Sequence, residues 1–313
     1  MKKKLDKIVL LLILAVLFYG AMLIYADVEI VVKKIFEINW KYIPLILSLI
    51  GIQIGILAFR YHRLLKKLGI SIPFKESFKI FVAGLSMTIT PLGGGTGIKS
   101  HLLKKNFGYS ISSTLPIVLV ERWTELLSIL ILMIILLFLT TMYASYIAVI
   151  LGLIMVGVLV IITSNSKLFT YYKKFFLKIK YLRKFSMSLE ESKNSIKILY
   201  RKKTIFEAVG LSFVSKIIQL FAVFYIFLAV GLEFDFFQAG QIYYTSMVFG
   251  SISFIPGGII VTESSMLGLL LENGIQVSIA TLIVILSRLV TIWLFTIVGT
   301  VALKFEMARK PES

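Results

Sequence analysis

The sequence contains no cysteine and only two histidines, and charged residues make up only 16% of its 313 positions. The lack of cysteine excludes a disulfide framework and cysteine-ligated metals. A soluble protein would carry charge at roughly a quarter of its positions. The few charges are also bunched, because residues 8–25 and 126–166 contain none. Uncharged apolar runs of about 18 residues or more are typical of membrane spans, so the sequence excludes a soluble protein.

Six apolar segments predict full membrane spans. Together with two interrupted segments, they indicate an all-α polytopic membrane protein that forms a single integral membrane domain over residues 1–313. The first span is longer than the apolar part of a signal peptide and lacks a small-residue cleavage site, so we interpret it as a retained anchor. The six segments cover residues 8–25, 43–59, 111–140, 146–163, 204–230 and 275–303.

Acidic residues are scarce, with 16 against 34 lysines and arginines, which gives a net charge of +18. If both termini lie in the cytoplasm, only Lys33, Lys34 and Lys41 among the basic residues of the loops lie outside. This positive-inside bias predicts a multi-pass protein of the cell membrane with both termini cytoplasmic. The bias accounts for most of the net charge, so nucleic acid is not an expected partner.

The longest hydrophilic stretch predicts a basic amphipathic cytoplasmic connector over residues 164–203. Its apolar residues recur at near-helical spacing among many lysines and arginines. Such a helix would lie against anionic headgroups of the inner leaflet. A plain connector that sets the topology fits equally well. No separate soluble domain fits in this loop.

Two apolar segments are interrupted by proline and glycine. Residues 80–98 are uncharged but contain Pro91, Gly93, Gly94 and Gly95, and residues 236–262 contain Pro256, Gly257 and Gly258. Both residue types break helices, and broken backbone inside a bilayer must be buried in protein or line a wet cavity. We therefore interpret the segments as re-entrant helix hairpins that enter from opposite sides. Kinked full spans, for one or both segments, are the alternative.

The two halves of the chain share a pattern. Pro91 is followed by Gly108 and Arg122, and Pro256 is followed by Gly274 and Arg288. The glycine-to-arginine spacing is 14 residues in both halves. Inverted repeats with broken helices at matching positions indicate a transporter site near the midplane. We place the first repeat at residues 43–140 and the second at residues 204–303.

These residues resemble a known family, the flippase-type transmembrane region of lysylphosphatidylglycerol synthases. The resemblance implies a membrane protein that moves lipid between leaflets, either alone or fused to a soluble transferase. The chain lacks the soluble transferase domain, so aminoacylation is not implied, and it departs from the pattern at Ile259 and Ile260, where relatives often have another glycine. The matching residues are Pro91, Leu92, Gly93, Gly94, Gly95, Lys99, Leu102, Leu103, Gly108, Glu121 and Arg122 in the first motif, and Phe254, Ile255, Pro256, Gly257, Gly258, Glu263, Gly274, Ala280 and Arg288 in the second.

Charged residues inside apolar segments are the candidate headgroup-binding site, because a buried charge needs a partner or water. Arginine binds phosphate oxygens through two parallel hydrogen bonds, and the glycines at the hairpin tips would let phosphate approach the backbone. Glu263 is expected to pair with an arginine or to bind a proton or cation. The alternative is an internal salt-bridge network without substrate contact, and Lys99 is also explained as an interfacial anchor. The candidates are Lys99, Glu121, Arg122, Glu125, Lys216, Glu263 and Arg288.

The predicted function is the translocation, or flipping, of an anionic phospholipid or polyprenyl-linked lipid between membrane leaflets, without catalysis, cofactor or metal. One alternative is a secondary transporter of a small anion or solute. Another is a non-transporting scaffold for a lipid-modifying or glycosyltransfer enzyme. The expected partners are lipids with anionic headgroups, and the further candidates are a separate lipid-modifying enzyme and a second copy of the chain in a homodimer.

Overall fold

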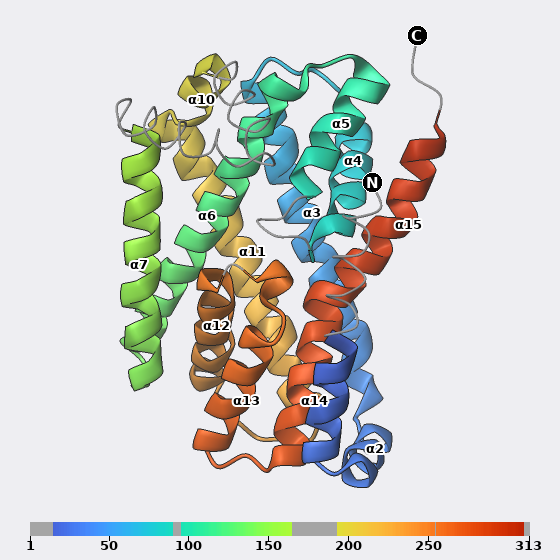
Figure 1. Ribbon diagram of the computed structural model, residues 1–313, viewed down its shortest axis with the longest axis vertical. Helices are drawn as coiled ribbons and strands as arrows, with labels where there is room; N and C mark the ends of the chain where they lie inside the picture. The colour runs from blue at the N-terminus through green and yellow to red at the C-terminus, as the bar shows by residue number, and fades with distance from the viewer. Residues whose placement is uncertain (1–14, 90–94, 165–192, 254, 310–313) are drawn as a thin grey trace.

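The computed structural model describes residues 15–89, 95–164, 193–253 and 255–309 (Figure 1). All regular structure in these ranges is helical, as predicted. The first predicted tip, at Pro91, Gly93 and Gly94, lies outside the described residues, as does most of the basic connector. A helix over Ala15–Tyr25 comes first. The α-helices that follow are α2 (Val28–Phe36), α3 (Ile43–Lys67), α4 (Phe74–Gly84), α5 (Gly95–Phe107), α6 (Ile111–Leu137), α7 (Tyr143–Ser164), α10 (Lys193–Leu199), α11 (Lys202–Ala229), α12 (Phe236–Ile252), α13 (Val261–Glu272), α14 (Val277–Arg288) and α15 (Leu294–Ala308).

Several of these helices have the length and composition of membrane spans. Trp40–Lys67, Lys202–Ala229 and Val277–Ala308 are long and apolar enough, and a fourth span exists if Ala15–Tyr25 and α2, bent by 91°, count as one. The short 3₁₀ turn η1 (Trp40–Tyr42) leads into α3, and the π turn η5 (Leu289–Trp293) joins α14 to α15. α6 is also long enough at 27 residues, but three charged residues lie near its middle. The protein is therefore a helical membrane protein.

The helix ends follow from local chemistry. The side chain of Ser110 accepts a hydrogen bond from the Ser113 N–H at 3.2 Å and caps α6, and Asp235 caps α12 through the Gln238 N–H at 2.8 Å. Gly108 ends α5 with φ 76°, and Gly274 ends α13 with φ 79°. Positive φ is the glycine-favoured way to end a helix. The two glycines that match in the sequence therefore each end a helix in their half of the chain.

The described helices of both interrupted segments lie on either side of the predicted tips. α4 continues into the 3₁₀ turn η2 (Leu85–Met87), and α5 begins at Gly95. α12 ends before the 3₁₀ turn η4 (Pro256–Gly258), and α13 follows. Figure 1 shows α4 and α5 in the upper half of the molecule and α12 and α13 in the lower half.

One glycine in each hairpin lets its two arms approach closely. A Cβ added at Gly84 of α4 would lie 2.5 Å from Cγ of Lys99 in α5, and one at Gly250 of α12 would lie 1.9 Å from Oγ1 of Thr262 in α13. Real Cβ atoms do not come so close to other heavy atoms. Both glycines precede the proline of their segment by six or seven residues (84 to 91 and 250 to 256). The two hairpins are thus built alike.

The two hairpins also meet each other and the last helix. A Cβ added at Gly257 would lie 3.5 Å from Cα of Ile89, so the turn of the second hairpin touches the chain just before the first tip. A Cβ at Gly299 of α15 would lie 2.1 Å from the backbone N of Ser86 and 2.5 Å from the carbonyl carbon of Leu85. η2 is therefore packed directly against the backbone of α15.

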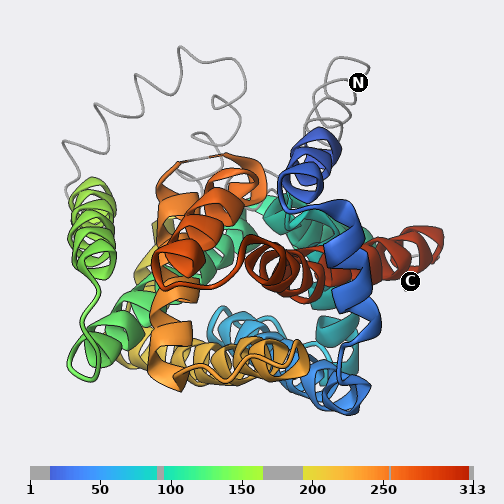
Figure 2. The same cartoon turned by 90° about the horizontal axis from the view of Figure 1, so that it is seen from below.

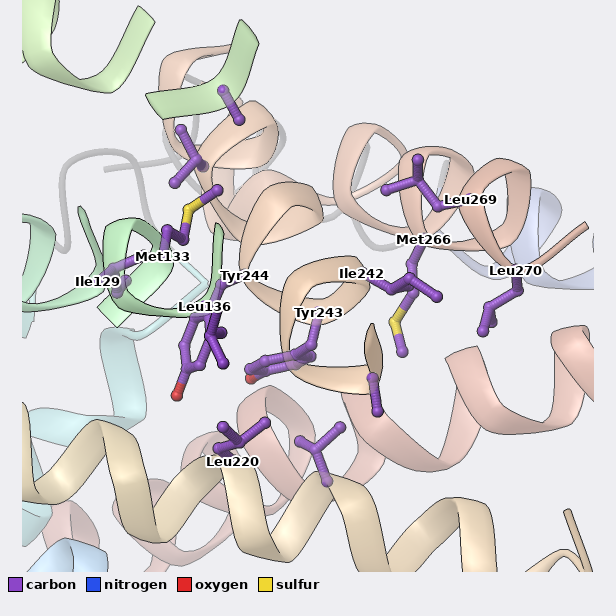
Figure 3. Close-up of a cluster of buried hydrophobic side chains, with 14 of the residues drawn as sticks. Ile129, Met133, Leu136, Leu220, Ile242, Tyr243, Tyr244, Met266, Leu269 and Leu270 are labelled. Atoms are coloured by element: carbon purple, nitrogen blue, oxygen red, sulfur yellow. The ribbon is translucent and has the colours of Figure 1, made fainter. Parts of the chain in front are cut away.

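The largest apolar core lies where α6, α11, α12 and α13 meet (Figure 3). Met133 and Leu136 of α6 and Leu220 of α11 face Tyr243 and Tyr244 of α12, and all five are buried. Helices in lipid associate through such packing, because lipid tails are as apolar as the side chains. Figure 2 shows α7 at the edge of the bundle. The core holds the second hairpin against the two long helices.

Candidate functional site

Arg60 of α3 is the centre of a buried group of charges. Its side chain is 1% exposed. Nη1 donates to Oγ of Ser212 in α11 at 2.6 Å, and Nη2 donates to Oε1 of Glu125 in α6 at 2.7 Å. Nη2 also lies 3.6 Å from Oε1 of Glu121. One guanidinium thus joins α3, α6 and α11.

Lys99 joins the first hairpin to this group. Its ammonium donates to Oε2 of Glu121, and it lies 4.8 Å from the ring centroid of Tyr61 and 5.1 Å from that of Phe81. The side chain is buried, and its stem passes over Gly84. The interpretation of Lys99 as an interfacial anchor was therefore wrong, because its charge is paired inside the protein.

Arg122 and Lys216 complete the group, in two different environments. Arg122 is 49% exposed and lies 3.2 Å from Oε2 of Glu125. Lys216 of α11 is 6% exposed and donates to Oε1 of Gln219 at 3.1 Å. It interacts electrostatically with Glu125, but no carboxylate of the described residues lies within 4.0 Å of its ammonium. Arg122 is thus accessible, and Lys216 is buried without an ion pair among these residues.

We call Arg60, Lys99, Glu121, Arg122, Glu125 and Lys216 the first charge cluster. It contains four cations and two carboxylates, so two positive charges are in excess. Arg122 is half-exposed, so the remaining three cations and two carboxylates carry one excess positive charge away from solvent. Excess buried charge is costly, and it favours a bound anion.

A second, smaller cluster lies in the other half of the chain. Glu263 of α13 is fully buried, and its Oε1 accepts hydrogen bonds from Nε of Arg288 at 2.7 Å and from the hydroxyl of Tyr19 at 2.8 Å. Nη2 of Arg288 donates to the carbonyl of Gly257 at 2.6 Å, and Nε1 of Trp293 donates to the Tyr19 hydroxyl at 3.4 Å. The expected pairing of Glu263 with an arginine is present. Among the described residues, Arg288 pairs with Glu263 and not with a carboxylate of the first charge cluster, because it binds its own hairpin.

Each half contains one ion pair between the second arm of its hairpin and the helix that follows, and the cation and the carboxylate are exchanged between the two halves. In the first half the second arm of the hairpin supplies the cation, Lys99, and the next helix supplies the carboxylate, Glu121. In the second half α13 supplies the carboxylate, Glu263, and α14 supplies the cation, Arg288. Each pair fastens a hairpin to the helix that follows it. Among the described residues, the further cations Arg60, Arg122 and Lys216 lie around the first of these two pairs, so the charge excess lies there.

Sequence reasoning missed Arg60. It ended the second span at Phe59 and placed Arg60 in a cytoplasmic loop, whereas α3 continues to Lys67. The sequence does contain an indication that Arg60 is buried. Gln53 and Arg60 are seven residues apart, and they lie on the same buried face of α3 as Ile50 and Leu57. Two polar residues at helical spacing on an apolar face indicate a buried polar contact.

Ile260 occupies a backbone conformation that favours glycine. Its φ is 77° and its ψ −54°. A β-branched residue at positive φ is strained by about 1–3 kcal/mol. The strain lies between η4 and the start of α13, directly before Glu263.

Replacing this residue by glycine provides a test of the strain. We expect Ile260→Gly to cost less stability than Ile259→Gly, because only the first change relieves a positive φ, whereas Ile259 is buried at φ −58°. The measurement is thermal unfolding of the two variants in the same detergent. Equal losses, or a larger loss for Ile260→Gly, would show that the backbone is not strained there.

Comparison with known proteins agrees with this architecture. A family model described as the lysylphosphatidylglycerol synthase transmembrane region matches residues 9–299. The chain belongs to this family. A UPF0104 membrane protein of Pyrococcus horikoshii is 26% identical over 93% of this chain and 94% of its own length. Another, of Methanocaldococcus jannaschii, is 27% identical over 97% of this chain and 96% of its own.

A third relative is also similar to this chain over most of its length. A UPF0104 membrane protein of Methanothermobacter thermautotrophicus is 18% identical over 84% of this chain and 85% of its own length. No solved structure matches the chain. The family match covers the membrane region alone, and no catalytic domain is detected in this chain.

Proposed function

We propose that this member of the family moves an anionic lipid, a phospholipid or a polyprenyl-linked lipid, between the two leaflets. The observation that carries the proposal is the charge excess of the first cluster, in which four cations face two carboxylates. Membership of the transmembrane family supports it. The headgroup would pass the cluster while its chains stay in lipid.

In this proposal the six spans and the two hairpins form inverted repeats, and both hairpins are re-entrant. The breaks at Gly95 and at η4, the matching glycines and the ion pairs of opposite polarity support it. Arg122 is half-exposed and would meet the headgroup first, and buried Lys216 would balance its charge deeper inside. Arginine suits the first contact because its planar guanidinium matches two phosphate oxygens.

Lys216 provides the direct test. We expect Lys216→Gln to slow the movement of a fluorescent phosphatidylglycerol at least tenfold, because the change removes a buried charge and keeps a hydrogen-bond donor for Gln219. Reconstituted liposomes with a membrane-impermeant quencher report how fast label moves between leaflets. Lys197→Gln is the matched control, because Lys197 is exposed on α10.

Three results would contradict the proposal. Unchanged movement in Lys216→Gln would exclude the cluster as the headgroup site. Movement of a water-soluble anion without lipid would favour a secondary transporter. No movement of either, together with loss of a partner enzyme's activity after deletion of residues 173–203, would favour the scaffold.

A further inference from the structure

A small pocket lies between α3 and α11, at the end of α3 that is farther from η1. Arg60, Arg63 and Lys67 of α3 line one side, and Thr204 and Glu207 of α11 line the other. We call it the α3–α11 pocket. Arg60 belongs both to this pocket and to the first charge cluster. Arg60 therefore links the pocket to the first charge cluster.

The pocket holds three cations and one carboxylate. Nε of Arg63 donates to Oε1 of Glu207, and Nζ of Lys67 lies 3.4 Å from Oε2 of the same carboxylate. The side chains of Arg63, Lys67 and Glu207 are 41%, 28% and 26% exposed. Positions 60, 63 and 67 follow one face of α3. Glu207 thus holds two cations that a larger anion could also bind.

Two further features favour an anion here. Among the described residues, the buried Nε of Arg60 has no hydrogen-bond partner, although both terminal nitrogens of the guanidinium donate hydrogen bonds. α11 begins at Lys202 without a side-chain cap, and Thr204 and Glu207 lie in its first two turns. The N-terminus of a helix attracts negative charge through its free N–H groups and its dipole. Both features lie beside the same pocket.

We propose that the α3–α11 pocket is the docking subsite for the phosphate group of the headgroup, and that Glu207 is an internal competitor which the phosphate displaces. The inference rests on the proposed function. Arg63 and Lys67 then bind the phosphate, and Glu207 returns to them when it leaves. Lys67 and Arg60 are seven positions apart on α3, which is about 10 Å along the helix axis at 1.5 Å per residue. The phosphate is thereby delivered from a half-exposed pocket to the buried cluster.

The test measures binding to the full-length protein in a neutral detergent. The probe is a short-chain fluorescent phosphatidylglycerol, followed by anisotropy, with fluorescent diacylglycerol as the probe without phosphate. We expect Arg63→Gln and Lys67→Gln each to weaken phosphatidylglycerol binding about tenfold, since each removes a charged hydrogen bond. Glu207→Gln is expected to strengthen binding severalfold, because the competing carboxylate loses its charge. Lys79→Gln, at an ion pair with Glu76 on α4, is the matched control and should bind as the unaltered protein does.

The direction of the Glu207→Gln effect separates docking from a purely structural ion pair. A structural pair would make Glu207→Gln as harmful as Arg63→Gln, and that result would overturn the inference. Equal binding of diacylglycerol would also overturn it. Arg63→Lys, which keeps the charge, should stay within about threefold of the unaltered protein, so the inference remains testable if Arg63→Gln fails to fold.

Competition with inorganic phosphate distinguishes a free anion from a lipid headgroup. Displacement of the probe by phosphate, with the same dependence on Arg63 and Lys67, would support a site that recognises phosphate alone. Resistance to phosphate with unchanged dependence on both cations would support a site that needs the lipid. If lipid movement depends on Lys216 while the three pocket variants bind normally, the docking inference fails and the proposed function stands. If the pocket variants shift binding as expected while no lipid moves, the proposed function fails and the anion site stands.

Discussion

Arg288→Met is expected to destabilise the protein by about 3–5 kcal/mol, because it leaves the carboxylate of Glu263 buried without its cation. Glu263 is fully buried, and after the change the Tyr19 hydroxyl would be the one hydrogen-bond donor left to it among the described residues. Methionine fills much of the arginine's volume, so a cavity contributes little. The loss also frees the carbonyl of Gly257 and loosens the turn of the second hairpin.

Thermal unfolding in detergent measures this loss, which corresponds to a fall in Tm of roughly 5–15 °C. The informative partner is the double variant Glu263→Leu with Arg288→Met. Replacing both members of a buried pair by apolar residues is often neutral, so the double variant should recover most of the Tm. If Arg288→Met instead keeps its Tm and loses only lipid movement, Arg288 contacts substrate and the structural interpretation of the pair is wrong.

The second large effect is expected at Gly299. A Cβ there would lie 2.1 Å from the backbone N of Ser86, so Gly299→Val forces α15 away from η2. A backbone atom cannot rotate away as a side chain can, and overpacking of this kind typically costs about 1–3 kcal/mol, or more where nothing yields. The displaced turn lies directly before the first hairpin tip, so we expect loss of stability and of lipid movement together.

Gly268→Ala is the matched control. Gly268 lies inside α13, and a Cβ there would have no heavy atom within 4 Å. Alanine favours a helix over glycine by about 1 kcal/mol, so this variant should unfold at the same temperature or slightly above. Both variants are compared by thermal unfolding and by the liposome assay. Equal behaviour of the two would show that α15 and η2 are not in close contact.

Local rules predicted the helices and their interruptions well. The proline and glycine at 256–258 predict a break, and a break is present there, because a missing donor and a flexible backbone act within a few residues. In the first segment the described helices end at Met87 and begin again at Gly95, on either side of the predicted tip. Gly108 and Gly274 were likewise recognised as matching positions. Their role in ending α5 and α13 is visible in their positive φ.

The partners of the charges could not be predicted in the same way. Glu121 pairs with Lys99 and lies near Arg60, which come from two other helices. Such contacts depend on how α3, α5 and α6 pack, and one sequence carries little information on packing. Arg122 is half-exposed, and its exposure could not be predicted because position along a helix does not define the face that a side chain occupies.

The contact between Gly257 and the chain at Ile89 gives the two halves a common pivot. Because the turn of the second hairpin lies against the chain just before the first tip, a shift of one hairpin would press on the other. If the chain moves lipid as proposed, this contact would couple the opening toward one leaflet to the closing toward the other.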